Sequence, residues 1–358
     1  MSNQNNHILL GFDSFRLVGA LSVLFSHSYL ITQGTEGSEP LQQLLHGGKN
    51  VAGLYGVFTF FVISGFLLSS SLNRNPDILR FAVNRSLRLL PGFACCVLFS
   101  ALVIGPIFSQ LSFLDYMTSP ELIQYLKSSF TTLADAPLPG VFNYSGIVSE
   151  VVNGSLWSLR AEVMSYLILL VLWTILPAPG WVALALGGLG VAIIAQPKLI
   201  ALLPEVGYPL PFFAAGVVIW WLTKHLGDSR LIAQFCGVGL LIGVLQGFPH
   251  TAFAFFGAYL VIYLGSRSTP LTPWIQRHGD ISYGLYLFGW PVQQMLRQVL
   301  DLREPLAMFL LSSVLTAALA WCLFHSVERP ALTLRKPLLA WLRRFKQGFL
   351  NAIPGKAS

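Results

Sequence analysis

The chain has 358 residues, of which 54% are apolar and only 10% are charged. Soluble domains carry about 25% charged residues, so this composition excludes an ordinary soluble protein and predicts a multi-pass membrane protein. The formal net charge is +7. Basic residues in membrane proteins mark cytoplasmic loops and contacts with anionic lipid, and we therefore expect no binding of nucleic acid.

Apolar runs predict an all-α integral membrane fold, a bundle of about ten transmembrane helices, because one span needs about 20 mostly apolar residues. The runs, bounded by charged residues, Pro and Gly, occupy residues 12–31, 53–72, 92–111, 157–176, 181–195, 208–223, 231–248, 250–265, 281–299 and 305–325. Three of them, at 181–195, 208–223 and 250–265, are short or begin with proline, so eight or eleven spans are alternatives.

The distribution of basic residues predicts that both termini are cytoplasmic, since Lys and Arg accumulate in cytoplasmic loops. With this orientation, fifteen Lys and Arg residues fall in cytoplasmic segments and five in external ones. Residues 1–10 lack the basic region and cleavage site of a signal peptide, so we expect the first run to stay in the membrane. We expect a membrane-embedded domain over residues 1–334 and a basic amphipathic cytoplasmic tail over 335–358, lying along the inner leaflet.

The first run contains three ionisable residues, Asp13, Arg16 and His27, and such residues inside a span are costly and usually functional. The eleven residues from Arg16 to His27 turn a helix about 20° beyond three full turns, so both side chains share one face, about 16 Å apart. Asp13 lies one turn before Arg16 and is placed to pair with it. This face predicts a polar path across the bilayer. The alternative is an arginine that snorkels to the interface and a histidine near the headgroups.

Two further pairs of residues suggest contacts with another helix or a ligand. Ser64 and Gly65 interrupt the apolar segment FTFFVISGFLL and permit close backbone approach. Arg85 and Arg88 lie three residues apart on one helix face, just before Pro91. Paired guanidinium groups suit a phosphate-rich cytosolic ligand, and the alternative is a topology anchor.

Glu162 lies about five residues inside the outer end of the run at 157–176, at a depth similar to that of His27. A carboxylate at this depth would orient the imidazole if the two helices are neighbours. The alternatives are a pairing of Glu162 with Arg160 and a position at the lipid interface.

Six segments, taken together, resemble acyltransferase family 3, membrane enzymes that transfer acyl groups from acyl-CoA to sugars and related acceptors. They occur in the family's order between residues 12 and 330, and they read FDSFRLVGALSVLFSH, FTFFVISGFLL, NRSLRLLP, GSLWSLRAEVMSY, ISYGLYLFGWPVQQ and SVERP.

The resemblance implies specific roles for the residues that match the family's motifs. It implies that His27 is catalytic, that Arg16 is essential, and that Arg85 and Arg88 contact the acyl donor. Glu162 matches the glutamate of the WSLxxE pattern. Site residues expected beside these are Ser64 and Gly65 at the donor and Asp13 as the partner of Arg16. One departure is that Phe288, Gly289 and Trp290 stand where many members carry a second histidine.

The implied function is O-acyl transfer, with acetyl as the acyl group, from cytosolic acyl-CoA (acetyl-CoA) to a hydroxyl of an envelope or exported glycan. The implied location is the bacterial cytoplasmic membrane, and the expected partners are the glycan acceptor and membrane lipid, with no metal cofactor. His27 would act as a general base or carry the acyl group covalently, and the sequence leaves both routes open. Two other classes also stay open: a transporter or flippase for a glycan or lipid-linked sugar, and a non-enzymatic membrane subunit in which Arg16 and His27 only brace helices.

Overall fold

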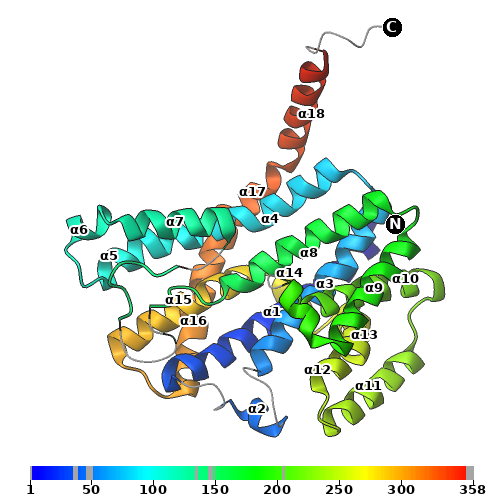
Figure 1. Cartoon of the computed structure of the whole chain (residues 1–358), viewed down its shortest axis with the longest axis horizontal. Helices are drawn as coiled ribbons and strands as arrows, with labels where there is room; N and C mark the ends of the chain where they lie inside the picture. The colour runs from blue at the N-terminus through cyan, green and yellow to red at the C-terminus, as the bar shows by residue number, and fades with distance from the viewer. Residues whose placement is uncertain are drawn as a thin grey trace.

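The computed structural model describes residues 2–34, 39–45, 51–133, 136–143, 148, 150–203 and 206–351, with side chains from residue 11 to 345 in these ranges, residue 51 excepted. Met1 and residues 352–358 of the expected tail lie outside the described residues. The described regular structure is entirely helical (Figure 1). In chain order its segments are α1 (Ser2–Gln33), α2 (Pro40–Leu44), α3 (Val51–Arg74), α4 (Ile78–Phe99), η1 (Ser100–Ile104), α5 (Gly105–Phe108), α6 (Phe113–Met117), α7 (Pro120–Thr132), α8 (Leu156–Ile175), α9 (Pro179–Ala195), η2 (Pro197–Leu202), α10 (Leu210–Leu226), α11 (Arg230–Leu245), α12 (Pro249–Ala252), η3 (Phe253–Gly257), α13 (Ala258–Gly265), α14 (Thr272–His278), α15 (Ser282–Leu300), α16 (Pro305–Leu323), η4 (Phe324–Glu328), α17 (Arg329–Thr333) and α18 (Arg335–Asn351).

The helices confirm an all-α integral membrane protein. Five helical stretches are long and apolar enough to cross a membrane: Gly11–Gln33, Ala52–Arg74, Ile78–Phe108, Leu156–Ile175 and Pro305–Phe345. Four further helices are also apolar but shorter: Pro179–Ala195, Leu210–Leu226, Arg230–Leu245 and Pro249–Gly265. Each of the ten predicted runs coincides with a helix, the run at 281–299 being α15. The number of spans that cross the bilayer and the cytoplasmic placement of both termini remain predictions.

The third predicted run begins too late. Its expected start at residue 92 is wrong, because one continuous helical stretch extends from Ile78 to Phe108 and passes through Pro91. The side chain of Asp77 caps this stretch by accepting a hydrogen bond from the Arg80 N–H at 3.0 Å. A proline inside a membrane helix is tolerated when neighbouring groups satisfy the freed backbone atoms. Consequently Arg85 and Arg88 lie within a helix and not in a loop.

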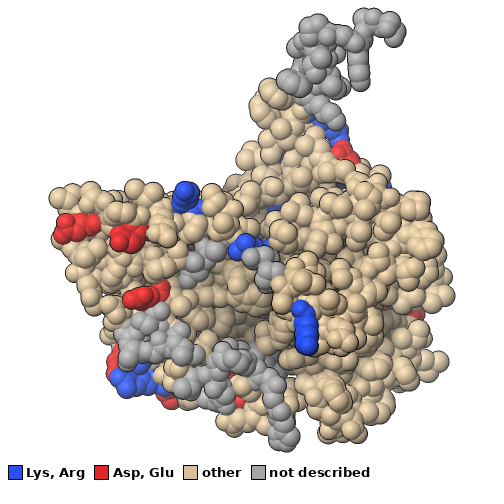
Figure 2. All heavy atoms as spheres, viewed as in Figure 1, with Lys and Arg blue, Asp and Glu red and all other residues tan. Residues whose placement is uncertain are grey.

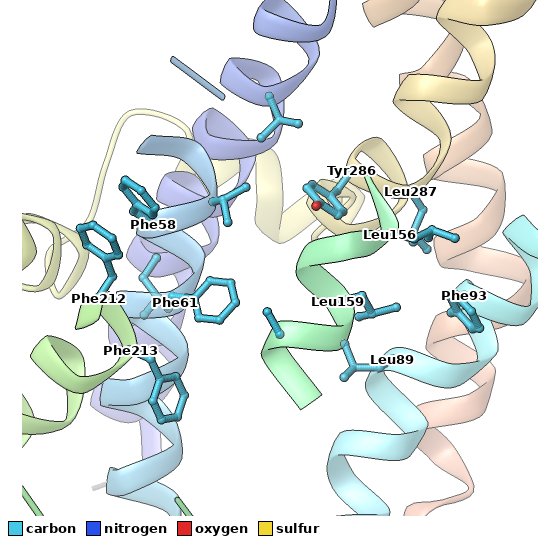
Figure 3. Packing of buried hydrophobic residues seen from close by; sticks show 14 of the residues in the cluster. Phe58, Phe61, Leu89, Phe93, Leu156, Leu159, Phe212, Phe213, Tyr286 and Leu287 are labelled. Atoms are coloured by element: carbon cyan, nitrogen blue, oxygen red, sulfur yellow. The ribbon is translucent and has the colours of Figure 1, made fainter. Parts of the chain in front are cut away.

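Helix α3 packs against α1 on one side and α10 on the other, and small residues set the second contact. A Cβ atom added to Gly65 would lie 2.1 Å from the carbonyl oxygen of Phe213 on α10. Nearby on the same interface, Phe58 of α3 stacks on Phe212 of α10 with ring centroids 3.5 Å apart (Figure 3). The close helix approach expected at Ser64 and Gly65 is therefore present.

Helix α15 packs against α1 and α16, and a buried glutamine joins all three. The Gln293 side-chain amide donates to the carbonyl oxygen of Leu24 at 2.9 Å and to the Ser312 hydroxyl at 3.1 Å. Hydrogen bonds of this kind help to hold helices together in membranes, because lipid tails are as apolar as the side chains and the hydrophobic effect does not drive helices to associate. The contact fixes α15 beside the C-terminal half of α1, which carries His27.

Helix α18 extends away from the bundle (Figure 1), beyond a surface on which most side chains are uncharged (Figure 2). Arg343 of α18 forms an ion pair with Asp77 at the start of α4. The Arg80 backbone N–H and the Arg343 guanidinium hold the pKa of the Asp77 carboxyl below its ordinary value. Trp341 and Phe345 on α18 are exposed, which leaves apolar surface available for the inner leaflet predicted for this tail.

Candidate active site

A cavity of about 80 Å³ lies where α1, α3, α4, α8 and α15 meet. Figure 3 shows part of its surroundings, with Phe61 on α3 facing Leu159 on α8, and Tyr286 of α15 beside α8. Six hydroxyl side chains, three arginines and one carboxylate line this cavity. They are Ser64, Ser158, Tyr166, Ser282, Tyr283 and Tyr286, then Arg16, Arg85 and Arg88, and finally Glu162.

A second cavity, of about 560 Å³, adjoins the first and is lined by α4, the second half of α3, the end of α17 and the start of α18. Its lining includes six arginines: Arg16, Arg74, Arg80, Arg85, Arg88 and Arg335. Arg16, Arg85 and Arg88 line both cavities, so these three guanidinium groups stand at the boundary between them. We call the larger space the basic cavity and the smaller one the hydroxyl cavity.

Arg88 is held by two carboxylates that are distant in the sequence. One guanidinium nitrogen donates to Asp280 at 2.6 Å and another to Glu328 at 3.2 Å. Glu328 is only 2% exposed, and it ends the π-helical segment η4. These bonds tie α4 to the segment before α15 and to the end of the α16–η4 stretch, so Arg88 has a structural partner set before any ligand binds.

Arg85 differs from Arg88 although both face the same two cavities. No hydrogen bond or ion pair joins its guanidinium to any residue in the described ranges. A guanidinium group offers five donors in a planar fork that matches phosphate. Of the two paired arginines, Arg85 is therefore the one whose donors are available to an anionic ligand.

The expected pairing of Asp13 with Arg16 is present, with 2.8 Å between the carboxylate oxygen and the guanidinium nitrogen. Both side chains are partly exposed, by 18% and 22% respectively. Arg16 thus reaches the boundary of the two cavities from α1 while Asp13 balances its charge. The predicted polar face of the first helix begins at this pair.

Glu162 lies in the hydroxyl cavity and accepts hydrogen bonds from two hydroxyl groups. Ser64 of α3 donates at 3.2 Å, and Tyr166, one turn further along α8, donates to the same oxygen. The structure brings Glu162 together with Ser64 and does not bring it into hydrogen-bond contact with His27 in the described part of the chain. Gly65 is absent from the cavity lining and contacts α10 instead.

His27 lies in the C-terminal half of α1 and is not among the residues that line the hydroxyl cavity. Its ring is partly exposed and packs edge-to-face on Trp290 of α15, with ring centroids 4.7 Å apart. Tyr286 of the hydroxyl cavity precedes Trp290 by four residues, so the two rings occupy successive turns of one face of α15. The cavity wall formed by α15 therefore continues to His27.

Several site residues were not identified from the sequence. Asp280 and Glu328 bind Arg88, and Tyr166 binds Glu162. A signal for the first two existed, because Asp280 precedes the segment ISYGLYLFGWPVQQ and Glu328 belongs to SVERP, both of which carry the family resemblance. Spacing alone gave no reason to join either segment to Arg88.

The comparisons with known proteins agree with this geometry. Residues 9–325 match the model of an acyltransferase domain, that of acyltransferase family 3, and the chain belongs to this family. It is 26% identical to an O-acetyl transferase of Shigella phage Sf6 over 92% of this chain and 98% of the relative. It is 27% identical to nodulation protein 10 of Rhizobium leguminosarum bv. viciae over 92% of this chain and 95% of the relative. No solved structure matches. The protein is thus an integral membrane acyltransferase.

Proposed function

We propose that the protein transfers an acetyl group from cytosolic acetyl-CoA to a hydroxyl of an envelope or exported glycan, in the bacterial cytoplasmic membrane. The observation that carries this proposal is that the basic cavity and the hydroxyl cavity share Arg16, Arg85 and Arg88. Tyr286 of the hydroxyl cavity lies one helical turn before Trp290, whose ring contacts His27. The acetyl group is supported by the relative named O-acetyl transferase.

The basic cavity suits the phosphates of the acyl-CoA donor. Arg85 would supply bidentate, charge-assisted hydrogen bonds to phosphate, because its guanidinium has no hydrogen-bond partner in the described chain. Arg88 would add positive charge while Asp280 and Glu328 hold it in place. The wall of the basic cavity contributes further arginines, which attract an anion before it docks.

The hydroxyl cavity suits the pantetheine arm of the donor, which carries amide groups and ends in the thioester. Ser64 donates to Glu162, Tyr286 donates to the Ser155 carbonyl oxygen, and Ser158 is hydrogen-bonded to Tyr286. The oxygens of these hydroxyl groups would therefore accept hydrogen bonds from the amide N–H groups of the arm. Glu162 accepts from Ser64 and Tyr166 and would hold these two hydroxyl groups in place beside the arm. The thioester would then reach His27.

At the thioester, the imidazole of His27 would take the proton of an acceptor hydroxyl as that oxygen attacks the acyl carbonyl carbon. The carbon–sulfur bond breaks, the CoA thiolate leaves and takes a proton from the imidazolium, and an ester forms on the acceptor. An acyl-imidazole intermediate on His27 is the competing route. Both routes require the ring to be reachable, in keeping with its partial exposure.

The decisive experiment compares envelope and secreted glycans from cells with the gene, without it, and with His27→Ala in its place. We expect a mass increment of one acetyl group per modified sugar, removable by mild base, only in the first strain. An unchanged ester profile in all three strains would refute the proposal. If the strain without the gene exports less glycan and the ester content of its glycans is unchanged, a flippase is favoured instead.

A further inference from the structure

The His27 ring packs against Trp290 in the described structure. The two rings meet edge-to-face, with an interplanar angle of 80°, and no hydrogen bond joins the His27 ring to a described residue. A catalytic histidine is commonly oriented by a hydrogen bond to its second ring nitrogen. In this protein the described contact of the His27 ring is its packing against the Trp290 indole.

Trp290 is itself fixed by the segment that leads into α8. Its indole N–H donates to the carbonyl oxygen of Val151 at 3.0 Å, and the residue is only 4% exposed. The same carbonyl oxygen accepts from the Gln294 side chain at 2.8 Å, one turn further along α15. The indole therefore cannot rotate without breaking this partly buried hydrogen bond.

Gly154 packs against the six-membered ring of the Trp290 indole. A Cβ atom added at Gly154 would lie 2.9 Å from three atoms of the Trp290 six-membered ring. Real Cβ atoms essentially never approach so closely, so an alanine here forces the indole to move. Gly154 has no left-handed backbone conformation, which means that the substitution acts through this contact and not through backbone strain.

We propose that Trp290 is a positioning residue for acyl transfer: held by Val151 and Gly154, it keeps the His27 ring in the orientation that accepts the proton. This inference rests on the proposed function. It gives a role to a residue of the stretch Phe288–Trp290, in which the resemblance expects a second histidine and this chain has none. A displacement of a catalytic group by about 1 Å lowers rates on the order of a hundredfold.

The test measures transfer of radiolabelled acetyl from acetyl-CoA to glycans in membrane vesicles of the producing strain, with rates normalised to the amount of protein. In Trp290→Leu and Gly154→Ala, the apparent kcat should fall about ten- to a hundredfold while the apparent KM for acetyl-CoA stays within about twofold. Trp290→Phe keeps an aromatic ring against His27 but loses the bond to Val151, so its kcat should lie between those of the wild type and Trp290→Leu. Gly188→Ala is the matched control, because nothing lies within 4 Å of its added Cβ.

The outcomes separate this inference from the proposed function. A Trp290→Leu enzyme with normal kcat, or one in which only KM rises, overturns the positioning role, as does a Trp290→Phe enzyme as impaired as Trp290→Leu. If Trp290→Leu fails to accumulate in the membrane, the kcat of Gly154→Ala tests the positioning role independently. Wild-type vesicles that transfer no label, or full activity in His27→Ala, would overturn the proposed function itself.

Discussion

Replacing Arg85 and Arg88 separately by alanine distinguishes a group that binds the donor from one that holds the fold. The two arginines lie one turn apart on α4 and line the same two cavities. Only Arg88 is bonded to carboxylates, at 2.6 Å to Asp280 and 3.2 Å to Glu328. We expect Arg88→Ala to lower stability and Arg85→Ala to lower donor affinity.

The magnitudes follow from the burial and the partners of each side chain. The exposed fractions of Arg88, Asp280 and Glu328 are 22%, 11% and 2%. Removal of the cation therefore leaves two carboxylates that have lost this partner and have little access to solvent. Breaking a buried ion pair in this way costs about 3–5 kcal/mol. Arg85 has no such partner, and loss of its charge-assisted hydrogen bonds to phosphate, about 1.5–3 kcal/mol, should weaken donor binding about ten- to a hundredfold.

The assay uses purified full-length protein in detergent. Thermal unfolding followed by tryptophan fluorescence should show a clear loss of melting temperature for Arg88→Ala and little change for Arg85→Ala. Titration with acetyl-CoA should show the weakened affinity for Arg85→Ala, with only partial recovery in Arg85→Lys because an ammonium group cannot bind bidentately. An unchanged melting temperature of Arg88→Ala would contradict the structural role of Arg88. An unchanged affinity of Arg85→Ala for acetyl-CoA would contradict donor binding by Arg85.

Three further predictions follow from the same contacts. His27→Ala should abolish acetyl transfer, by about 10²- to 10⁴-fold as for loss of a general base, at normal membrane level; residual transfer within threefold of wild type would revive a purely bracing role. Glu162→Gln should lower kcat more than it raises the KM for acetyl-CoA, since the carboxylate orders two hydroxyl donors; a KM effect alone would contradict this, and failure of cysteines at positions 27 and 162 to crosslink through a flexible reagent would exclude a direct pairing with His27. Gly65→Ala should reduce the melting temperature, because its Cβ would meet a backbone oxygen at 2.1 Å, whereas Gly188→Ala should not. Equal melting temperatures of the two variants would show that the α3–α10 interface accommodates the added methyl group without loss of stability.

Helix positions could be predicted from the sequence because apolar runs of span length leave few alternatives in a membrane. The ten predicted runs all coincide with helices, and the pairing of Asp13 with Arg16 followed from their spacing on one helix. The start of the third helix could not be predicted in this way. Pro91 suggested a boundary, but α4 continues through this proline, which membrane helices tolerate when neighbouring groups satisfy the freed backbone atoms.

The partners of the site residues could not be predicted, because helical periodicity gives the face on which a side chain lies and not the helix that covers this face. Arg88 meets Glu328 across 240 residues of sequence, and no spacing rule connects them. The expected neighbour of His27 was Glu162, and depth in the bilayer was the only evidence for it. The fold instead brings Trp290 to the His27 ring.

The sequence by itself thus determined the class of protein, the helices and the residues on which the chemistry depends, since composition, span length and ordered motifs are properties of the chain alone. Only the tertiary structure decided which of these residues are free to act. It neutralised Arg88 with two carboxylates and left Arg85 without a partner in the described residues. The physical reason is that a buried charge takes whichever counter-charge the packing of distant helices brings within hydrogen-bond distance.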